Sequence, residues 1–303
     1  MNYWQEKAGN ELSGLKLSFD KPMAKLTTFK IGGPVDLLVE PNNSAELELV
    51  LNFCLANNLP RLIIGSGSNL LVRDGGVRGI GIILSGEFLE WKINGTEVSA
   101  GAGLSLSKLA KETAEFGLSG LEFACGIPGT VGGGVFMNAG AYNGEISQVV
   151  ARTQVACAGK GTYWLEKAEL NFGYRRSRFQ IKTDEVVTGV EFSLNQESAD
   201  LTRAKINEFT SLRESKQPLE MPSAGSVFRR PEGYYVGPLI EEAGLKGFKI
   251  GGAQVSPKHA GFIVNSGGAT AQDVLSLIAH IRKVIKERNG LELIPEIKII
   301  GEE

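Results

Sequence analysis

The segment Cys125–Tyr142, CGIPGTVGGGVFMNAGAY, is the most informative part of this 303-residue chain. It contains a Pro-Gly turn signal at 128–129 and three consecutive glycines at 132–134. Glycine packs nothing and loses much backbone entropy on ordering, so such a run argues against a helix or strand. It suits a backbone that must approach a ligand, or several N–H groups that converge on one anion. The segment contains no Lys or Arg, so backbone amides would have to hold that anion. A plain connection between two strands fits the same pattern.

A second glycine-rich segment favours a ligand site. Gly65–Asn69 (GSGSN) follows a short apolar strand predicted at 62–64. A dinucleotide-binding fingerprint needs glycine at position 70 and a helix after it, but residue 70 is leucine and 70–76 predicts another strand and turn. No P-loop sequence occurs. The two loops therefore predict a site of a different class from the Rossmann and P-loop nucleotide sites.

The composition excludes several functional classes. A net charge of −2 argues against nucleic acid or an anionic membrane as the main partner. The three cysteines, Cys54, Cys125 and Cys157, fit no zinc spacing, and the only histidines are His259 and His280. We therefore expect no metal site and no histidine charge-relay triad. The N-terminus has no apolar run of signal-peptide length, so a cytoplasmic protein with reduced thiols is expected.

Helix and strand patterns mix without strict alternation, which predicts an α+β fold. Asn43 or Ser44 can cap a helix that ends before residue 57, and a second helix is predicted at 105–116. A third helix is predicted from Asp200 toward 216, where the sequence becomes rich in Pro and Gly and marks a domain boundary. A capping box at 270–273 begins a long helix that Gly290 ends.

Seven blocks in order resemble the UDP-N-acetylenolpyruvoylglucosamine reductase family, flavoenzymes that complete UDP-N-acetylmuramate for peptidoglycan, the cell-wall polymer. The blocks are Thr28–Gly33, Gly65–Asn69, Gly126–Gly133, Asn138–Tyr142, Gly173–Arg175, Gly225–Phe228 and Pro295–Glu296. Each block is weak alone, but the ordered set spans residues 27 to 301 and is highly specific.

The resemblance implies an FAD-binding fold of the vanillyl-alcohol-oxidase type. It predicts two α+β subdomains, at 1–86 and 87–213, and a C-terminal α+β substrate-binding domain at 214–298. The strand at 299–303 could return to the first subdomain. The short connection at 195–222 resembles the compact form of the family, without an inserted substrate-capping loop. The resemblance implies one non-covalent FAD, NADPH as co-substrate and a small UDP-sugar substrate. We expect no metal, and we expect the chain to be a monomer.

The resemblance also assigns site residues. Both glycine-rich loops would wrap the FAD pyrophosphate, and Asn138 and Tyr142 would contact the cofactor, although Tyr142 could instead have a packing role. The implied cofactor-binding residues are Gly65, Ser66, Gly67, Ser68, Asn69, Ile127, Pro128, Gly129, Thr130, Gly132, Gly133, Asn138, Gly140 and Tyr142. The implied catalytic residues are Arg175, Ser226 as proton donor, and Glu296. Ser226 could instead satisfy a turn beside Gly225, and Glu296 could be an ordinary surface carboxylate.

Six further residues are candidates for the substrate phosphates or carboxylate. They are Tyr174, Lys216, Arg229, Arg230, Tyr235 and Lys258. The pair Lys258–His259 also fits a plain surface pair, and the basic cluster at 175–178 fits a solvated edge.

Two other functions remain open at this point. One is an oxidase of the same flavin fold that acts on a small alcohol with O₂ and tethers its flavin through Cys125, which adjoins a glycine-rich loop. The other is a non-catalytic sensor of flavin or nucleotide sugar. Turnover with NADPH separates both from a reductase.

Overall fold

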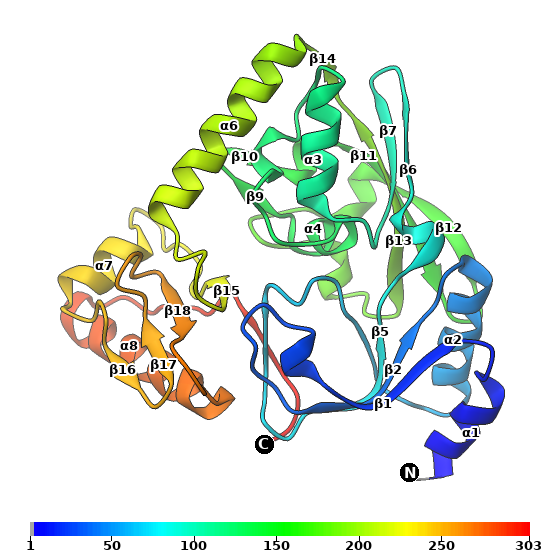
Figure 1. Ribbon diagram of the computed structural model, residues 1–303, viewed down its shortest axis with the longest axis horizontal. Helices are drawn as coiled ribbons and strands as arrows, with labels where there is room; N and C mark the ends of the chain where they lie inside the picture. The colour runs from blue at the N-terminus through cyan, green and yellow to red at the C-terminus, as the bar shows by residue number, and fades with distance from the viewer. Residues whose placement is uncertain (1–2) are drawn as a thin grey trace. The chain divides into compact units, whose positions relative to one another are not determined.

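The structure is a computed structural model that describes residues 3–303, and the chain divides into two compact units (Figure 1). Unit 1 contains the chain up to Phe19, Leu37–Ser66 and Gly79–Arg213. Unit 2 contains Asp20–Asp36, Gly67–Arg78 and Glu214–Glu303. The chain therefore passes several times from one unit to the other. Each unit has its own hydrophobic core.

Unit 1 is built on a five-stranded antiparallel sheet with the order β12-β11-β13-β7-β6. Its strands are β6 (Trp91–Asn94), β7 (Glu97–Gly101), β11 (Val150–Cys157), β12 (Gly161–Glu166) and β13 (Glu185–Ser193). Its helices are α1 (Tyr3–Glu11), α2 (Ser44–Ala56), α3 (Leu106–Glu115), α4 (Val131–Met137), α5 (Ile146–Val149) and α6 (Ala199–Lys216, which ends beyond the unit). The helix α4 packs against β7 and β13.

Further short elements and a second sheet lie along residues 16–196. The strands β8 (Leu118–Ser119) and β14 (Asn195–Gln196) pair, as do β9 (Gly140–Ala141) and β10 (Gly144–Glu145). A four-stranded sheet has the order β1 (Lys16–Pro22), β2 (Pro34–Glu40), β5 (Val77–Ile82) and β3 (Arg61–Ile63). Single 3₁₀ turns lie at Met23–Lys25, Gly86–Leu89, Glu122–Ala124, Lys167–Leu170 and Arg178–Gln180.

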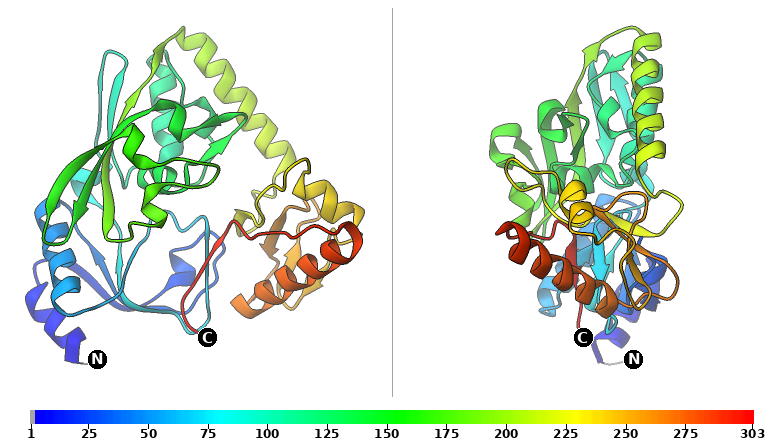
Figure 2. Two further views of the ribbon diagram at one scale, coloured as in Figure 1. Left: turned by 180° about the vertical axis from the view of Figure 1, so that it is seen from behind. Right: turned by 90° about the vertical axis from the view of Figure 1, so that its left-hand side faces the viewer.

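Unit 2 carries a smaller antiparallel sheet with the order β15-β18-β17-β16. Its strands are β15 (Ser223–Ser226), β16 (Lys249–Ile250), β17 (Ala253–Val255) and β18 (Phe262–Asn265), and its helices are α7 (Val236–Glu242) and α8 (Ala271–Asn289). The long helix α8 packs against β16 and β17 (Figure 1 and Figure 2). Its buried Val274, Leu277 and Ile281 recur every three or four residues, which places them on one helix face. The strands β4 (Leu70–Val72) and β19 (Lys298–Ile300) pair in parallel.

The predicted helix starts and ends are confirmed where the signal is local. Asn43 caps α2, because its side chain accepts a hydrogen bond from the Glu46 amide at 2.9 Å. Thr270 and Asp273 form the capping box of α8, and Gly290 ends that helix with a φ of +70°. By contrast, Asp200 lies in the first turn of α6, after the helix start at Ala199.

The three-part division at residues 86 and 213 stays a prediction. The return of the C-terminal strand to the first subdomain also stays a prediction; in the structure β19 pairs with β4, and both belong to unit 2. None of the helices within residues 3–303 is long and apolar enough to cross a membrane.

Candidate active site

The glycines at 132–134 lie inside the helix α4, against the local propensity of glycine. Gly132 donates its amide to Ala102 O at 2.8 Å, and a Cβ on Gly132 would lie 2.9 Å from the Cβ of Ala102. A Cβ on Gly134 would lie 2.9 Å from Leu106 Cδ2. Two of the three glycines therefore allow α4 to pack closely on 102–106. Tertiary packing outweighs helix propensity here, so the expectation that the glycine run avoids regular structure is wrong.

Thr130 is the point where both glycine-rich loops meet within unit 1. Its Oγ1 caps α4 by accepting the Gly133 amide at 3.1 Å. A Cβ on Gly65 would lie 2.7 Å from the same oxygen. Gly133 is exposed, and a Cβ there would meet only Thr130 Oγ1, at 3.3 Å. Gly133 is thus the glycine of this run at which a ligand can approach the backbone.

The amides of this segment are used within the protein. Gly132 and Gly133 donate as described above, and Gly129 donates to Ile127 O at 2.9 Å. The expectation that these amides converge on an anion is therefore not supported at these three positions.

In the other glycine-rich loop, Gly65–Asn69, the residue Gly67 belongs to unit 2. Its φ is +60° and a Cβ on it would lie 2.2 Å from Leu26 O, so only glycine fits there.

Arg213, near the end of α6, brings a positive charge next to the segment 125–142. Arg213 Cδ lies 2.5 Å from the position that a Cβ on Gly126 would occupy, so the arginine stem covers that glycine. Burial lowers the pKa of the Arg213 guanidinium, while nearby Tyr142 and Cys125 act in the opposite direction. No Asp or Glu among residues 3–303 forms an ion pair with Arg213. A partly buried cation without a carboxylate is a natural anion ligand. No sequence pattern connects residues 126 and 213, so sequence analysis missed it.

Asn138 has a supporting role in the fold, and its contact with the cofactor stays a prediction. Its side chain is fully buried, with 0% exposed. Its Nδ2 donates to Gly173 O at 3.0 Å, and its Oδ1 accepts the Ser147 amide at 2.9 Å. Both ends of the amide are therefore used inside the protein. Asn138 fixes the end of α4 to the turn at 173–176.

Tyr142 adopts the packing role that the sequence left open. Its ring stacks on Phe209 of α6, with ring centroids 4.4 Å apart and ring planes 4° apart. Its hydroxyl donates to Phe209 O at 3.2 Å. Burial raises the pKa of the Tyr142 hydroxyl, and the charge of Arg213 opposes that rise. Tyr142 therefore joins the segment after α4 to the helix that carries Arg213.

Arg175 is held in the left-handed region with a φ of +53°. Gly173 and Arg176 exchange two backbone hydrogen bonds of 3.0 Å around it. Arg175 Nη2 donates to Gly140 O at 2.8 Å, and its guanidinium lies 5.2 Å from the ring centre of Tyr174. Such strained positions concentrate at functional sites. In the same basic cluster, Arg178 is a structural residue, because Glu185 binds it at 2.7 Å.

Ser226 and Glu296, 70 residues apart in sequence, lie on neighbouring segments of unit 2. Glu296 donates its amide to Val227 O at 2.7 Å, and Phe228 forms a β-bridge with Pro295. The strand register shifts between residues 223 and 226, where Gly225 has a φ of +79°. Ser226 Oγ donates a long hydrogen bond of 3.4 Å to Phe228 O.

Asn69, the last residue of the first glycine-rich loop, borders this pair. Its Nδ2 donates to Glu296 O at 3.4 Å, and its carbonyl accepts the Lys298 amide at 2.9 Å. Arg229 lies nearby: its amide donates to Ile294 O at 2.9 Å, and its buried Nε has no hydrogen-bond partner. Burial and the charge of Arg229 lower the pKa of Lys298. These two cations make this part of unit 2 suitable for an anion.

The remaining substrate candidates differ in exposure and in the contacts that their side chains already make. The guanidinium of Arg230 lies 3.8 Å from the ring centre of Tyr235, which is 63% exposed. Lys216 is exposed at the end of α6. Lys258, however, donates Nζ to Glu214 O at 2.7 Å and lies 3.9 Å from a Glu220 carboxylate oxygen. The surface-pair interpretation therefore suits Lys258 better than a substrate contact.

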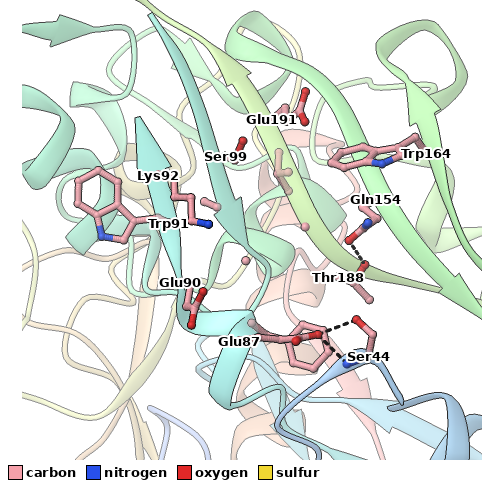
Figure 3. Close-up of a pocket in the computed structure, with 15 residues that line it drawn as sticks. Ser44, Glu87, Glu90, Trp91, Lys92, Ser99, Gln154, Trp164, Thr188 and Glu191 are labelled. Carbon is pink, nitrogen blue, oxygen red and sulfur yellow. Dashed lines mark hydrogen bonds between the residues drawn. The ribbon is translucent and has the colours of Figure 1, made fainter. Parts of the chain in front are cut away.

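A separate hollow of about 290 Å³ lies on the face of the five-stranded sheet that carries Gln154 and Trp164 (Figure 3). Its lining also includes Ser44, Glu87 and Glu191, and none of the predicted site residues. No cluster of three His, Cys, Asp or Glu that could hold a metal occurs in the part of the chain that the structure describes. The candidate site residues lie around Thr130 in unit 1 and around Ser226 in unit 2.

Two family models match the chain. Residues 35–164 match an FAD binding domain, and residues 217–300 match the C-terminal domain of UDP-N-acetylenolpyruvoylglucosamine reductase. These matches and the mixed helix and strand content confirm the predicted α+β class, with an FAD-binding part followed by a C-terminal domain.

Individual relatives with this same name match nearly the whole chain. The UDP-N-acetylenolpyruvoylglucosamine reductase of Clostridium botulinum is 48% identical over 284 residues, which cover 94% of this chain and 92% of the relative. That of Syntrophomonas wolfei is 46% identical over 95% of this chain and 96% of the relative. The crystal structure of the enzyme from Thermus caldophilus has a TM-score of 0.81 and 35% identity, over 94% of this chain and 98% of that one. The predicted resemblance is thus confirmed, and this chain belongs to the UDP-N-acetylenolpyruvoylglucosamine reductase family.

Proposed function

We propose that this chain is an FAD-containing, NADPH-dependent reductase. It reduces the enolpyruvyl ether of UDP-N-acetylglucosamine to UDP-N-acetylmuramate, a precursor of peptidoglycan. The observation that carries the proposal is the 2.7 Å hydrogen bond from the Glu296 amide to Val227 O. That bond joins the backbone segment that carries Ser226 to the one that carries Glu296, 70 residues away, in a chain that belongs to this family.

The residues around Thr130 fit an FAD pyrophosphate. Gly133 is exposed and leaves room for a close approach of the ligand, and Arg213 supplies a charge without a carboxylate partner. When bound there, FAD would supply the redox chemistry, the transfer of a hydride from NADPH to the substrate. The non-covalent mode is supported by Cys125, which is 3% exposed and lies 3.9 Å from Ile206 O and Thr210 Oγ1. A buried thiol is poorly suited to the flavin tether that an oxidase of this fold would use.

The protein residues manage charge and a proton. A hydride that adds to the terminal carbon of the enolpyruvyl double bond leaves the electron pair on the α-carbon and its carboxylate. The Arg175 guanidinium stabilises this charge, because its planar fork can donate two hydrogen bonds to a carboxylate. The Ser226 hydroxyl then gives its proton to the α-carbon, and the new C–H bond completes the lactyl ether. The serine recovers its proton from solvent, and Glu296 belongs to the same proton-transfer site.

The Ser226→Ala variant tests this assignment, because only the second half-reaction needs the serine proton. The loss of yellow flavin colour with NADPH should proceed at the wild-type rate. Recovery of the colour with the enolpyruvyl substrate should slow by about 10²- to 10⁴-fold, the usual contribution of positioned proton transfer. Ser226→Cys should recover part of that rate, since a thiol is the stronger acid. Ser223→Ala, in the same strand, is the matched control. Equal slowing of both half-reactions in a fully flavinated Ser226→Ala protein means that the serine is structural.

The proposal includes a cytoplasmic location and a monomeric state. Both of its substrates, NADPH and the UDP-sugar, are small molecules. Because both must present a reacting carbon to the same flavin, they should compete for one site and give parallel-line, ping-pong kinetics. Intersecting lines with a complex of both ligands contradict that arrangement.

A further inference from the structure

His259 is a residue to which the proposed reaction gives no role, yet its imidazole has one fixed orientation in unit 2. Its Nδ1 accepts the Gly261 amide at 3.1 Å. A Cβ on Gly261 would lie 3.1 Å from Nδ1, and a Cβ on Gly237 of α7 would lie 3.2 Å from Cε1. The ring also contacts Phe262 edge-on, with ring centroids 5.0 Å apart. The imidazole therefore fits between two glycines, and the bond from Gly261 requires an unprotonated Nδ1.

Gly261 connects this imidazole to both predicted proton-transfer residues. Its carbonyl accepts the Val227 amide at 3.0 Å, and the Val227 carbonyl accepts the Glu296 amide at 2.7 Å. A Cβ on Gly261 would also lie 3.7 Å from Ser226 Oγ. A continuous series of hydrogen bonds thus runs from His259 through Gly261 and Val227 to Glu296. Ser226 lies beside its middle.

We propose that His259 is a positioning residue that holds Ser226 and Glu296 in register through the Gly261 turn, and that its neutral imidazole is the form that does so. The role in catalysis rests on the proposed function. The anchoring itself is a property of unit 2 alone. A residue of this kind moves no proton in the reaction. It keeps the donor hydroxyl where the α-carbon arrives, and small displacements at such a position are costly in rate.

Protonation of the imidazole should release this anchor. A protonated Nδ1 would point its hydrogen at the Gly261 amide hydrogen, so the bond would be lost. Burial lowers the pKa of His259 below the ordinary 6.5, Lys246 lowers it further, and Glu241 of α7 raises it. Lys246 and Glu241 pair with each other at 2.7 Å, and the adjacent Lys258 lies 3.9 Å from Glu220. The anchor is therefore present at neutral pH and is lost as the pH falls through the lowered pKa.

Two substitutions distinguish the positioning role of His259 from the effect of its protonation. His259→Ala removes the acceptor for the Gly261 amide. His259→Asn keeps an acceptor, because the asparagine Oδ1 takes the place of Nδ1, but it has no proton to gain. In the holoenzyme, we expect His259→Ala to slow the recovery of flavin colour with the enolpyruvyl substrate about 10- to 100-fold. The loss of colour with NADPH should keep its wild-type rate. His259→Asn should restore most of the rate of colour recovery.

The pH profile and hydrogen exchange give readouts that a general loss of stability would not produce. Between about pH 5 and 8, wild-type colour recovery should decline on the acid side, and that decline should be absent in His259→Asn. Amide hydrogen exchange of the segments that contain Val227 and Glu296 should be faster in His259→Ala than in the wild type. The matched control is His280→Asn, because His280 lies on α8, stacked on Phe248 with ring centroids 4.6 Å apart. This control should change neither readout.

Each outcome bears on one claim. Wild-type exchange at Val227 and Glu296 in His259→Ala overturns the anchoring. Faster exchange with equal slowing of both half-reactions overturns the catalytic role. If His259→Ala does not fold, an acid decline that persists in His259→Asn overturns the proposal. If the wild type itself never regains colour with the enolpyruvyl substrate, the proposed function fails, and hydrogen exchange still decides the anchoring.

Discussion

Replacing Arg213 by methionine should weaken FAD binding without lowering the free energy of unfolding of the apoprotein. The guanidinium is partly buried, burial lowers its pKa, and no carboxylate among residues 3–303 pairs with it. A hydrogen bond to a charged group contributes about 1.5 to 3 kcal/mol. At about 1.4 kcal/mol for each tenfold change, the dissociation constant of FAD should rise roughly 10- to 150-fold. Methionine keeps an unbranched stem over Gly126, so the contact of that stem is preserved.

The assay is a titration of apoprotein with FAD, followed by flavin fluorescence, beside urea unfolding of the same apoprotein. The free energy of unfolding should stay the same or increase in Arg213→Met, because the substitution removes a partly buried positive charge that has no carboxylate partner. Arg203→Met on the same helix is the control, since Arg203 is exposed and pairs with Glu115 at 3.1 Å. It should leave the affinity for FAD unchanged. A wild-type affinity in Arg213→Met refutes the role of this arginine as an anion ligand.

Two further predictions concern the other site residues. Arg175→Lys should slow colour recovery with the enolpyruvyl substrate although the charge is kept, because an ammonium cannot reproduce the planar fork; wild-type turnover, measured by NADPH consumption, would mean that another arginine carries this role. Gly133→Val should give a folded protein with little bound FAD, whereas Gly132→Val should also lose about 1 to 3 kcal/mol of unfolding free energy through overpacking against Ala102; full flavin content in Gly133→Val would contradict the proposed approach of FAD to this backbone.

Features with local causes could be predicted from the sequence. The caps at Asn43 and Thr270 are examples, because a side chain and an amide three residues later determine them. The family resemblance was also accessible, since its blocks keep their order along the chain. Both kinds of inference depend on residues that are close in sequence or on a fixed order of motifs.

Features with tertiary causes could not be predicted. The glycines 132–134 lie in a helix, and two of them leave the space that Ala102 and Leu106 occupy. No local signal in the sequence reveals this packing. The supporting role of Asn138 is another example, because only the fold brings the carbonyl of Gly173 and the amide of Ser147 to the two ends of its side chain. Arg213 could not be connected with Gly126, because only the fold brings them together.

The central claim is that this chain passes a hydride from NADPH to the enolpyruvyl ether of UDP-N-acetylglucosamine. The most direct measurement follows the flavin colour of the holoenzyme without oxygen, with NADPH added first and the UDP-sugar second. We expect NADPH to remove the yellow colour and the UDP-sugar to restore it, with one UDP-N-acetylmuramate formed for each NADPH consumed. Colour that returns only when oxygen is admitted would indicate an oxidase, and colour that NADPH never removes would indicate a binding protein; either result contradicts the account.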